Sequence, residues 1–136
     1  MLVRDYMTGK VVTANLLDGL RQTWDRMHER RVRHMPVVDE HGALVGIVSD
    51  RDLRRPANQD EPNTTHYFAL DNTVKVEEAM TAAPVTVRED DPVDVALQIF
   101  VDRRFGALPV IDGAGALVGL ISTIDLLRAC RDRHAL

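Results

Sequence analysis

The sequence predicts an α/β (α+β) fold made of two tandem copies of one βαββα unit. Three observations lead to this fold class: an internal repeat, an amphipathic helix in each copy, and two short strands joined by a tight turn in each copy. Residues 3–53 align without a gap against residues 76–126, with 19 identities over 51 positions. Average residue usage would give about 3. Because such short repeats cannot each close a core, we expect the two copies to pack as one pseudo-symmetric domain with a ligand cleft between them.

Each copy begins with a short lead, 3–7 or 76–80, followed by a β-prone stretch that ends at 12–13 or 85–87. A helix is predicted next, because apolar residues recur at i, i+4 and i+7. These residues are Leu20, Trp24 and Met27 in the first copy and Val93, Leu97 and Phe100 in the second. Asp18 and Asp91 precede the two helices and are candidate N-caps.

Two strands and a second helix complete each copy. The segments MPVVD-EHG-ALVGIVS and LPVID-GAG-ALVGLIS read as strand, turn and strand, and Gly42 and Gly115 suit the turn. The second helix is expected to begin at Asp50 or Thr123. We therefore place the first repeat at 1–55, a polar linker at 56–74 and the second repeat at 75–136. An apolar knot of His66, Tyr67, Phe68 and Leu70 is expected to pack the end of the linker onto the domain.

Composition excludes several classes of protein. The chain is 45% hydrophobic and 28% charged, and its net charge of -4 argues against binding to duplex nucleic acid. No apolar run approaches the roughly 20 residues of a membrane span, and no secretion signal is recognisable, so a soluble, cytoplasmic protein without a membrane partner is expected. The single cysteine and the scattered histidines offer no zinc-ligand spacing, so no metal is expected.

The paired strand segments, each followed by Ser-x-x-Asp-Leu, resemble those of the CBS-domain pair, also called the Bateman module. The match covers almost the whole chain, and RVRHMPVVDEHGALVGIVSDRDLR with HYFALDNTVKVEEAMT is similar to stand-alone bacterial members of the acetoin-utilisation type. Those members often carry a further C-terminal domain, which we expect this chain to lack. The resemblance implies two repeats related by a pseudo-twofold axis, and modules that associate in pairs. It also implies clefts between the repeats that bind AMP, ADP, ATP, S-adenosylmethionine or related nucleotides.

The Ser-x-x-Asp segments are the first candidate ligand-binding residues: Ser49 with Asp52, and Ser122 with Asp125. A carboxylate at this position can accept hydrogen bonds from ribose hydroxyls, as an acidic residue does in other nucleotide folds. The same spacing is also that of a helix capping box, in which serine is the N-cap. Two interpretations stay open: a cap alone, or a cap that also contacts ribose.

Basic residues before Pro36 are the second candidates. Family members place phosphate-binding groups two and three positions before this proline, and these positions are His34 and Arg33. Guanidinium suits phosphate because it is planar, always charged and offers paired donors. The second repeat has Ala107 and Gly106 there, so the two sites are predicted to be unequal. Arg51 is a weaker second phosphate candidate.

The remaining candidates come from the resemblance. Val12 and Thr13, with Val85 and Thr86, correspond to family residues that line the adenine pocket, although β-branched residues also simply suit a strand. Met35 and Pro36, with Leu108 and Pro109, lie beside the phosphate positions, and the prolines are expected to be structural.

The sequence lacks the phosphate-loop, dinucleotide and zinc-protease motifs and any nucleophile placed beside a base, so no catalytic residue, catalytic cofactor or enzyme activity is predicted. We predict a regulatory module that binds an adenosyl nucleotide, forms a homodimer and signals to an unidentified partner protein. The alternative is a ligand-free dimerisation scaffold whose Ser-x-x-Asp segments are only caps.

Overall fold

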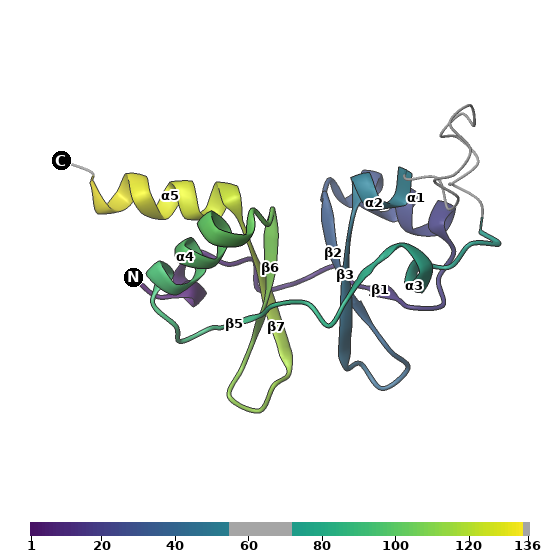
Figure 1. Cartoon of the computed structure of the whole chain (residues 1–136), viewed down its shortest axis with the longest axis horizontal. Coiled ribbons are helices and arrows are strands. Elements are labelled where there is room, and N and C mark those ends of the chain that lie inside the picture. The colour runs from purple at the N-terminus through teal and green to yellow at the C-terminus, as the bar shows by residue number, and fades with distance from the viewer. Residues whose placement is uncertain (55–71, 135–136) are drawn as a thin grey trace. The chain divides into compact units, whose positions relative to one another are not determined.

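The computed structural model describes residues 1–54 and 72–134 and confirms the mixed α/β fold (Figure 1). In chain order its elements are η1 (Val3–Asp5), β1 (Ala14–Asn15), α1 (Leu20–Arg30), β2 (His34–Val38), β3 (Leu44–Ser49), α2 (Asp50–Arg54), α3 (Val76–Ala79), β4 (Thr81–Ala82), β5 (Val87–Arg88), α4 (Val93–Arg103), β6 (Ala107–Ile111), β7 (Leu117–Ser122) and α5 (Thr123–Arg133). Most of the predicted linker and its apolar knot lie outside the described residues.

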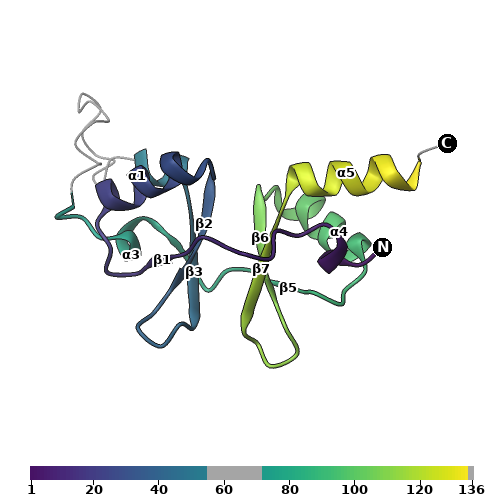
Figure 2. The same ribbon diagram turned by 180° about the vertical axis from the view of Figure 1, so that it is seen from behind.

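Two small sheets carry the strands. One has the order β1-β2-β3-β4 and the other the order β5-β6-β7. In both, a parallel pair precedes an antiparallel hairpin: β1 with β2 and β5 with β6, then β2 with β3 and β6 with β7. Figures 1 and 2 show α1 and α2 on one face of the β2–β3 hairpin and, separately, α4 and α5 on one face of β6–β7. The two repeats therefore share one local architecture.

The chain forms two compact units, and each unit contains most of one repeat together with the N-terminal lead of the other repeat. Unit 2 is Val12–Ala83, and unit 1 joins Met1–Val11 to Pro84–Leu136. Val3, from the start of the first repeat, is fully buried in the core of the second, whereas Val76 is fully buried in the core of the first. The repeats are thus consecutive in sequence, but each core is closed by residues from both.

A glycine inside the last strand of each hairpin leaves room for the lead that comes from the other repeat, called the exchanged lead below. A Cβ on Gly119 of β7 would lie 2.6 Å from Met7 Sδ and 2.9 Å from Thr8 O. A Cβ on Gly46 of β3 would meet the sulfur of Met80 in the same way. Only glycine lets these leads approach the strands so closely.

The predicted helix stripes form the two cores. Leu20 and Met27 are buried on α1 together with Thr23, and Val93 and Phe100 are buried on α4 together with Ala96. Trp24 and Leu97, the middle residues of the predicted stripes, are only partly buried against the same cores. The predicted turns are also confirmed, since Gly42 and Gly115 have φ values of +78° and +85°. Glycine takes this conformation without the steric cost of a side chain.

Two local expectations were wrong. Thr13 and Thr86 precede β1 and β5 instead of closing them. Asp18 and Asp91 are not N-caps, because the caps are Gly19 and Pro92. Each aspartate instead accepts a hydrogen bond from the backbone N–H three residues before it, at 2.9 Å, and so closes the turn that leads into the helix.

Asn72 supplies the missing cap on α1. Its Oδ1 accepts a hydrogen bond of 2.9 Å from the N–H of Gln22 in the first turn of the helix. The backbone on both sides of this contact is also paired, because the N–H of Leu20 donates to Val74 O at 3.0 Å. A residue 50 positions away therefore stabilises the start of α1, which local spacing could not reveal.

Candidate functional site

The Ser49–Asp52 segment of unit 2 forms a complete capping box at the start of α2. The N–H of Ser49 donates to Asp52 Oδ2 at 2.9 Å, and the N–H of Asp52 donates to Ser49 Oγ at 3.0 Å. The cap is therefore present whether or not the carboxylate also meets a ligand. Asp52 is half-buried at the point where β3 passes into α2.

His34 and Arg33 lie beside this box, because β2 pairs with β3 so that His34 is opposite Ser49. The carbonyl of Arg33 accepts a hydrogen bond of 2.9 Å from the N–H of Asp50. Burial lowers the pKa of His34 below 6.5, and the nearby carboxylates of Asp50 and Asp52 partly oppose this shift. His34 is therefore neutral at pH 7, and Arg33, which is exposed, supplies the permanent positive charge.

Unit 1 repeats the box at the start of α5 with one added partner. The N–H and Oγ of Ser122 donate to Asp125 Oδ2 at 2.8 and 3.0 Å. Arg128 pairs with the other oxygen, Oδ1, from one turn along the helix. Ala107 is opposite Ser122, so this unit offers neither an imidazole nor a guanidinium where unit 2 has His34 and Arg33.

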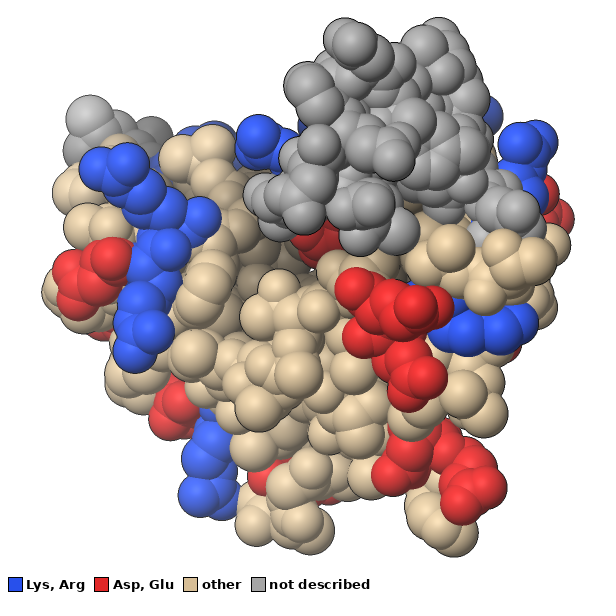
Figure 3. Space-filling model, turned by 45° about the vertical axis from the view of Figure 1, so that its right-hand side comes forward, with Lys and Arg blue, Asp and Glu red and all other residues tan. Residues whose placement is uncertain are grey.

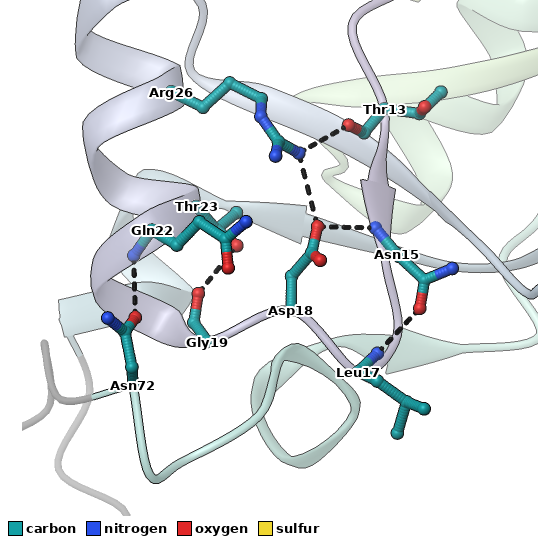
Figure 4. A network of polar contacts seen from close by, with 9 residues as sticks. All are labelled: Thr13, Asn15, Leu17, Asp18, Gly19, Gln22, Thr23, Arg26 and Asn72. Atoms are coloured by element: carbon teal, nitrogen blue, oxygen red, sulfur yellow. Dashed lines mark hydrogen bonds and ion pairs between the residues drawn. The ribbon is translucent and has the colours of Figure 1, made fainter.

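Thr13 is held by a polar network that the sequence analysis missed (Figure 4). Arg26 Nη1 donates to the carbonyl of Thr13 at 3.0 Å and to Asp18 Oδ2 at 3.2 Å. Asp18 in turn accepts from the N–H of Asn15, so α1 is tied to the segment leading into β1. The second repeat has Ile99 at the position aligned with Arg26. This replacement was the available signal, because it places a charge where the other repeat keeps an apolar side chain.

The side chains of Met35 and Leu108 point into the cores of their units, so only their main chain is available to a ligand. Val12 and Val85 are partly buried and pack against the same cores. Thr86 is half-buried and Arg51 is exposed.

Pro36 and Pro109 are buried inside β2 and β6 rather than leading into them. The carbonyl of Val38 accepts from the N–H of Leu16 on the β1 side. The backbone N and C=O groups of successive residues point toward opposite edges of a strand, so those of Pro36 and Val38 point to the same edge. The nitrogen of Pro36 therefore also faces β1, which pairs with β2 only from Val37 onward. The missing N–H therefore costs the sheet no hydrogen bond.

Each repeat therefore contributes its candidates to one unit. In unit 2 these are Val12, Thr13, Arg33, His34, Met35, Pro36, Ser49, Arg51 and Asp52, and in unit 1 they are Val85, Thr86, Ala107, Leu108, Pro109, Ser122 and Asp125. Within a unit, the register of the hairpin brings the phosphate positions next to the capping box. The candidate set is thus two related sites, and only the unit 2 site has basic side chains at the phosphate positions.

On the face drawn in Figure 3, basic and acidic side chains both gather in groups, some of them in contact with each other, among uncharged side chains. Among residues 1–54 and 72–134, no cluster of histidine, cysteine and carboxylate side chains could hold a metal ion. Across those same ranges, every helix is too short or too polar to cross a bilayer.

Comparison with known proteins identifies the family. The CBS domain model matches residues 3–57 and 76–132, and the chain belongs to the CBS domain family as a tandem pair. A CBS domain-containing protein of Dictyostelium discoideum is 33% identical over 130 residues, which cover 93% of this chain and 89% of that protein.

A solved structure and an enzyme relative extend the comparison. The CBS domain pair of protein MJ0100, in complex with 5'-methylthioadenosine and S-adenosyl-L-methionine, is 28% identical with a TM-score of 0.79, and the match covers 98% of both chains. The inosine-5'-monophosphate dehydrogenase of Mycobacterium tuberculosis is 36% identical over 107 residues, which cover 78% of this chain but 17% of that enzyme. The chain therefore matches only a small region of this larger enzyme.

Proposed function

We propose that this chain is a cytoplasmic regulatory module that binds adenosine-containing ligands at the two capping-box sites and signals to a partner protein. The observation that carries the proposal is the position of Asp52 and Asp125, each bound to a serine at a helix start beside the phosphate positions. A helix start of this kind presents free N–H groups and partial positive charge to an anionic ligand. The adenosyl compounds bound by the related MJ0100 pair support the ligand class.

We further propose that AMP, ADP and ATP bind more tightly in unit 2 than in unit 1, because Gly106 and Ala107 replace Arg33 and His34 at the aligned positions of unit 1. Since His34 is neutral at pH 7, it offers one ring N–H, and Arg33 carries the attraction to phosphate. S-adenosylmethionine has no phosphate, so it does not need this pair and suits either site. Binding then favours one arrangement of the protein, and a partner with different affinity for that arrangement detects it.

Calorimetry with AMP, ATP and S-adenosylmethionine tests the proposal. Charge-assisted hydrogen bonds contribute about 1.5–3 kcal/mol, and exposure of Arg33 puts the expected effect near the low end, about tenfold in AMP affinity for Arg33→Ala. Arg30→Ala is the matched control, because it removes an exposed arginine from the end of α1 and should leave affinity unchanged. Equal AMP affinity in wild type and Arg33→Ala would remove the assignment of phosphate to unit 2.

A ligand-free dimerisation scaffold is the second candidate. It is favoured by the capping boxes themselves, because they account for both serine and aspartate pairs without any ligand. A thermal-shift screen separates the two functions, since a ligand at 100 times its Kd adds about 2.7 kcal/mol of stability. A shift with an adenosyl ligand favours the regulatory module. No shift with AMP, ATP, S-adenosylmethionine or NADH favours the scaffold.

Both candidates include a homodimer, which we assign to the exposed face of α4 and α5. Val101, Ile124 and Leu127 are 67%, 64% and 59% exposed. The aligned residues of the first repeat are His28, Arg51 and Arg54, so this face is apolar only in unit 1. Exposed apolar side chains on two packed helices favour a contact with a second copy, and such contacts are most often twofold.

Light scattering at micromolar concentration tests the dimer. Leu127→Glu should give a monomer, because it would place two like charges in a twofold contact. Arg54→Glu, at the aligned position on α2, is the control and should leave the dimer intact. A monomeric wild type would refute the assignment.

A further inference from the structure

Both oxygens of the Asp125 carboxylate are already engaged in unit 1. Oδ2 accepts from the N–H and the Oγ of Ser122, and Oδ1 accepts from Arg128 Nη2. The side chain of Asp125 is 10% exposed, whereas that of Arg128 is 51% exposed. The guanidinium therefore lies between a nearly buried carboxylate and solvent.

Arg128 is held there by the exchanged lead. Its Nη2 also donates to the carbonyl of Tyr6 at 3.4 Å. The hydroxyl of Tyr6 donates to Asp132 Oδ2 at 2.8 Å, one turn further along α5. The N-terminal lead and α5 thus place the guanidinium on the carboxylate, and the cap requires none of these contacts.

A count of acceptor positions shows the consequence for ribose. A carboxylate offers about 4 acceptor positions, and in Asp125 two are taken by Ser122 and one by Arg128. One position is left, whereas the 2'- and 3'-hydroxyls of ribose donate two hydrogen bonds. Both hydroxyls can bind Asp125 only after Arg128 leaves it.

We propose that Arg128 competes with the ribose diol for Asp125, so that the unit 1 site accepts an adenosyl ligand only when Arg128 moves into solvent. The proposal rests on the function proposed above and adds to it a residue that sets the affinity of one site. Because the arginine is half exposed, its ion pair with Asp125 is weak, and displacement costs about two- to fivefold in affinity. Arg55 aligns with Arg128 in the first repeat but lies outside the described residues, so the proposal concerns Asp125 alone.

The test isolates the unit 1 site and varies the sugar. Asp52→Asn weakens the unit 2 site and keeps a side-chain oxygen for its cap. AMP and 2'-deoxy-AMP are then titrated by calorimetry into Asp52→Asn with and without Arg128→Ala. We expect Arg128→Ala to tighten AMP about two- to fivefold and to leave 2'-deoxy-AMP unchanged, because one hydroxyl needs only the position that is already open. Arg133→Ala, an exposed arginine on the same helix that pairs with Asp94, is the control and should change neither affinity.

The outcomes separate the inference from the proposed function. Weaker or unchanged AMP binding in Arg128→Ala, or an equal gain with 2'-deoxy-AMP, would overturn the role of Arg128 while leaving an adenosyl-binding protein. No binding in the Asp52→Asn pair, when wild type binds AMP, would also overturn it. No heat from wild type with AMP or S-adenosylmethionine would overturn the proposed function and this inference together. Circular dichroism of each variant confirms that it is folded.

Discussion

Replacing Val3 with alanine tests whether the leads are exchanged between the repeats. Val3 is fully buried among residues of the second repeat, including Val93. The backbone of the lead is paired there as well, since the N–H of Val3 donates to Asp91 O at 2.9 Å and the N–H of Val93 donates to Met1 O at 3.0 Å. If the lead served its own repeat, Val3 would instead pack near Leu20, which aligns with Val93.

The expected loss follows from the two buried methyl groups that the substitution removes. Each contributes about 0.8 kcal/mol of transfer free energy, and the cavity left in a closed core adds to it. Val3→Ala should therefore lower the free energy of unfolding by about 2–3 kcal/mol. Met1→Ala, an exposed change in the same lead, should have almost no effect.

Double-mutant cycles decide which core Val3 belongs to. Urea unfolding followed by circular dichroism is measured for Val3→Ala, Val93→Ala and Leu20→Ala alone, and for Val3→Ala combined with each of the other two. Neighbours in one core couple by about 0.5 kcal/mol or more, whereas distant pairs add within about 0.3–0.5 kcal/mol. We expect coupling with Val93 and additivity with Leu20. Coupling with Leu20 and additivity with Val93 would refute the exchange.

Three further changes address the polar network, the histidine and the helix end. Arg26→Met removes one hydrogen-bond donor from the Thr13 carbonyl and from the Asp18 carboxylate and should cost about 1 kcal/mol in urea unfolding. Arg21→Met breaks only an exposed ion pair and should cost almost nothing. The pKa of His34 is lowered in the folded chain, so the unfolded chain binds more protons and the free energy of unfolding should fall as the pH drops below 6.5. His34→Gln should reduce this pH dependence, and an unchanged pH profile in the variant would contradict the role of His34. Arg31 has a φ of +55°, a conformation that strains a residue with a side chain, so Arg31→Gly should raise the free energy of unfolding by about 0.5–1 kcal/mol. Arg30→Gly, inside the helix, should lower it, and equal losses in the two variants would exclude backbone strain at Arg31.

Much of the candidate site could be predicted because it depends on neighbours in sequence. Ser49 and Asp52, three residues apart, form the expected capping box, and Ser122 with Asp125 forms the second. The hairpin that brings His34 opposite Ser49 follows from two strands and a tight turn. Spacing alone predicts such contacts because helix and strand geometry place these residues together.

The network around Arg26 and the ion pair of Arg128 were not predicted. Arg26 reads as one more polar residue on an amphipathic helix, and nothing in the spacing shows that its guanidinium reaches the carbonyl of Thr13. Arg128 is three residues after Asp125, a spacing common on helix surfaces, so its effect on a binding carboxylate is visible only once Asp125 is seen to be nearly buried. These roles depend on burial and side-chain direction.

The sequence by itself determined the duplication, the helix stripes, the turns and the capping boxes, because each arises from contacts within a few residues or within one hairpin. Only the tertiary structure decided which lead closes which core. Val3 and Val76 occupy aligned positions and are the same residue type, so either would suit either core by composition. The connections at Val11–Val12 and Ala83–Pro84 carry each lead to the other repeat, and such a choice between equivalent partners is settled by the path of the whole chain.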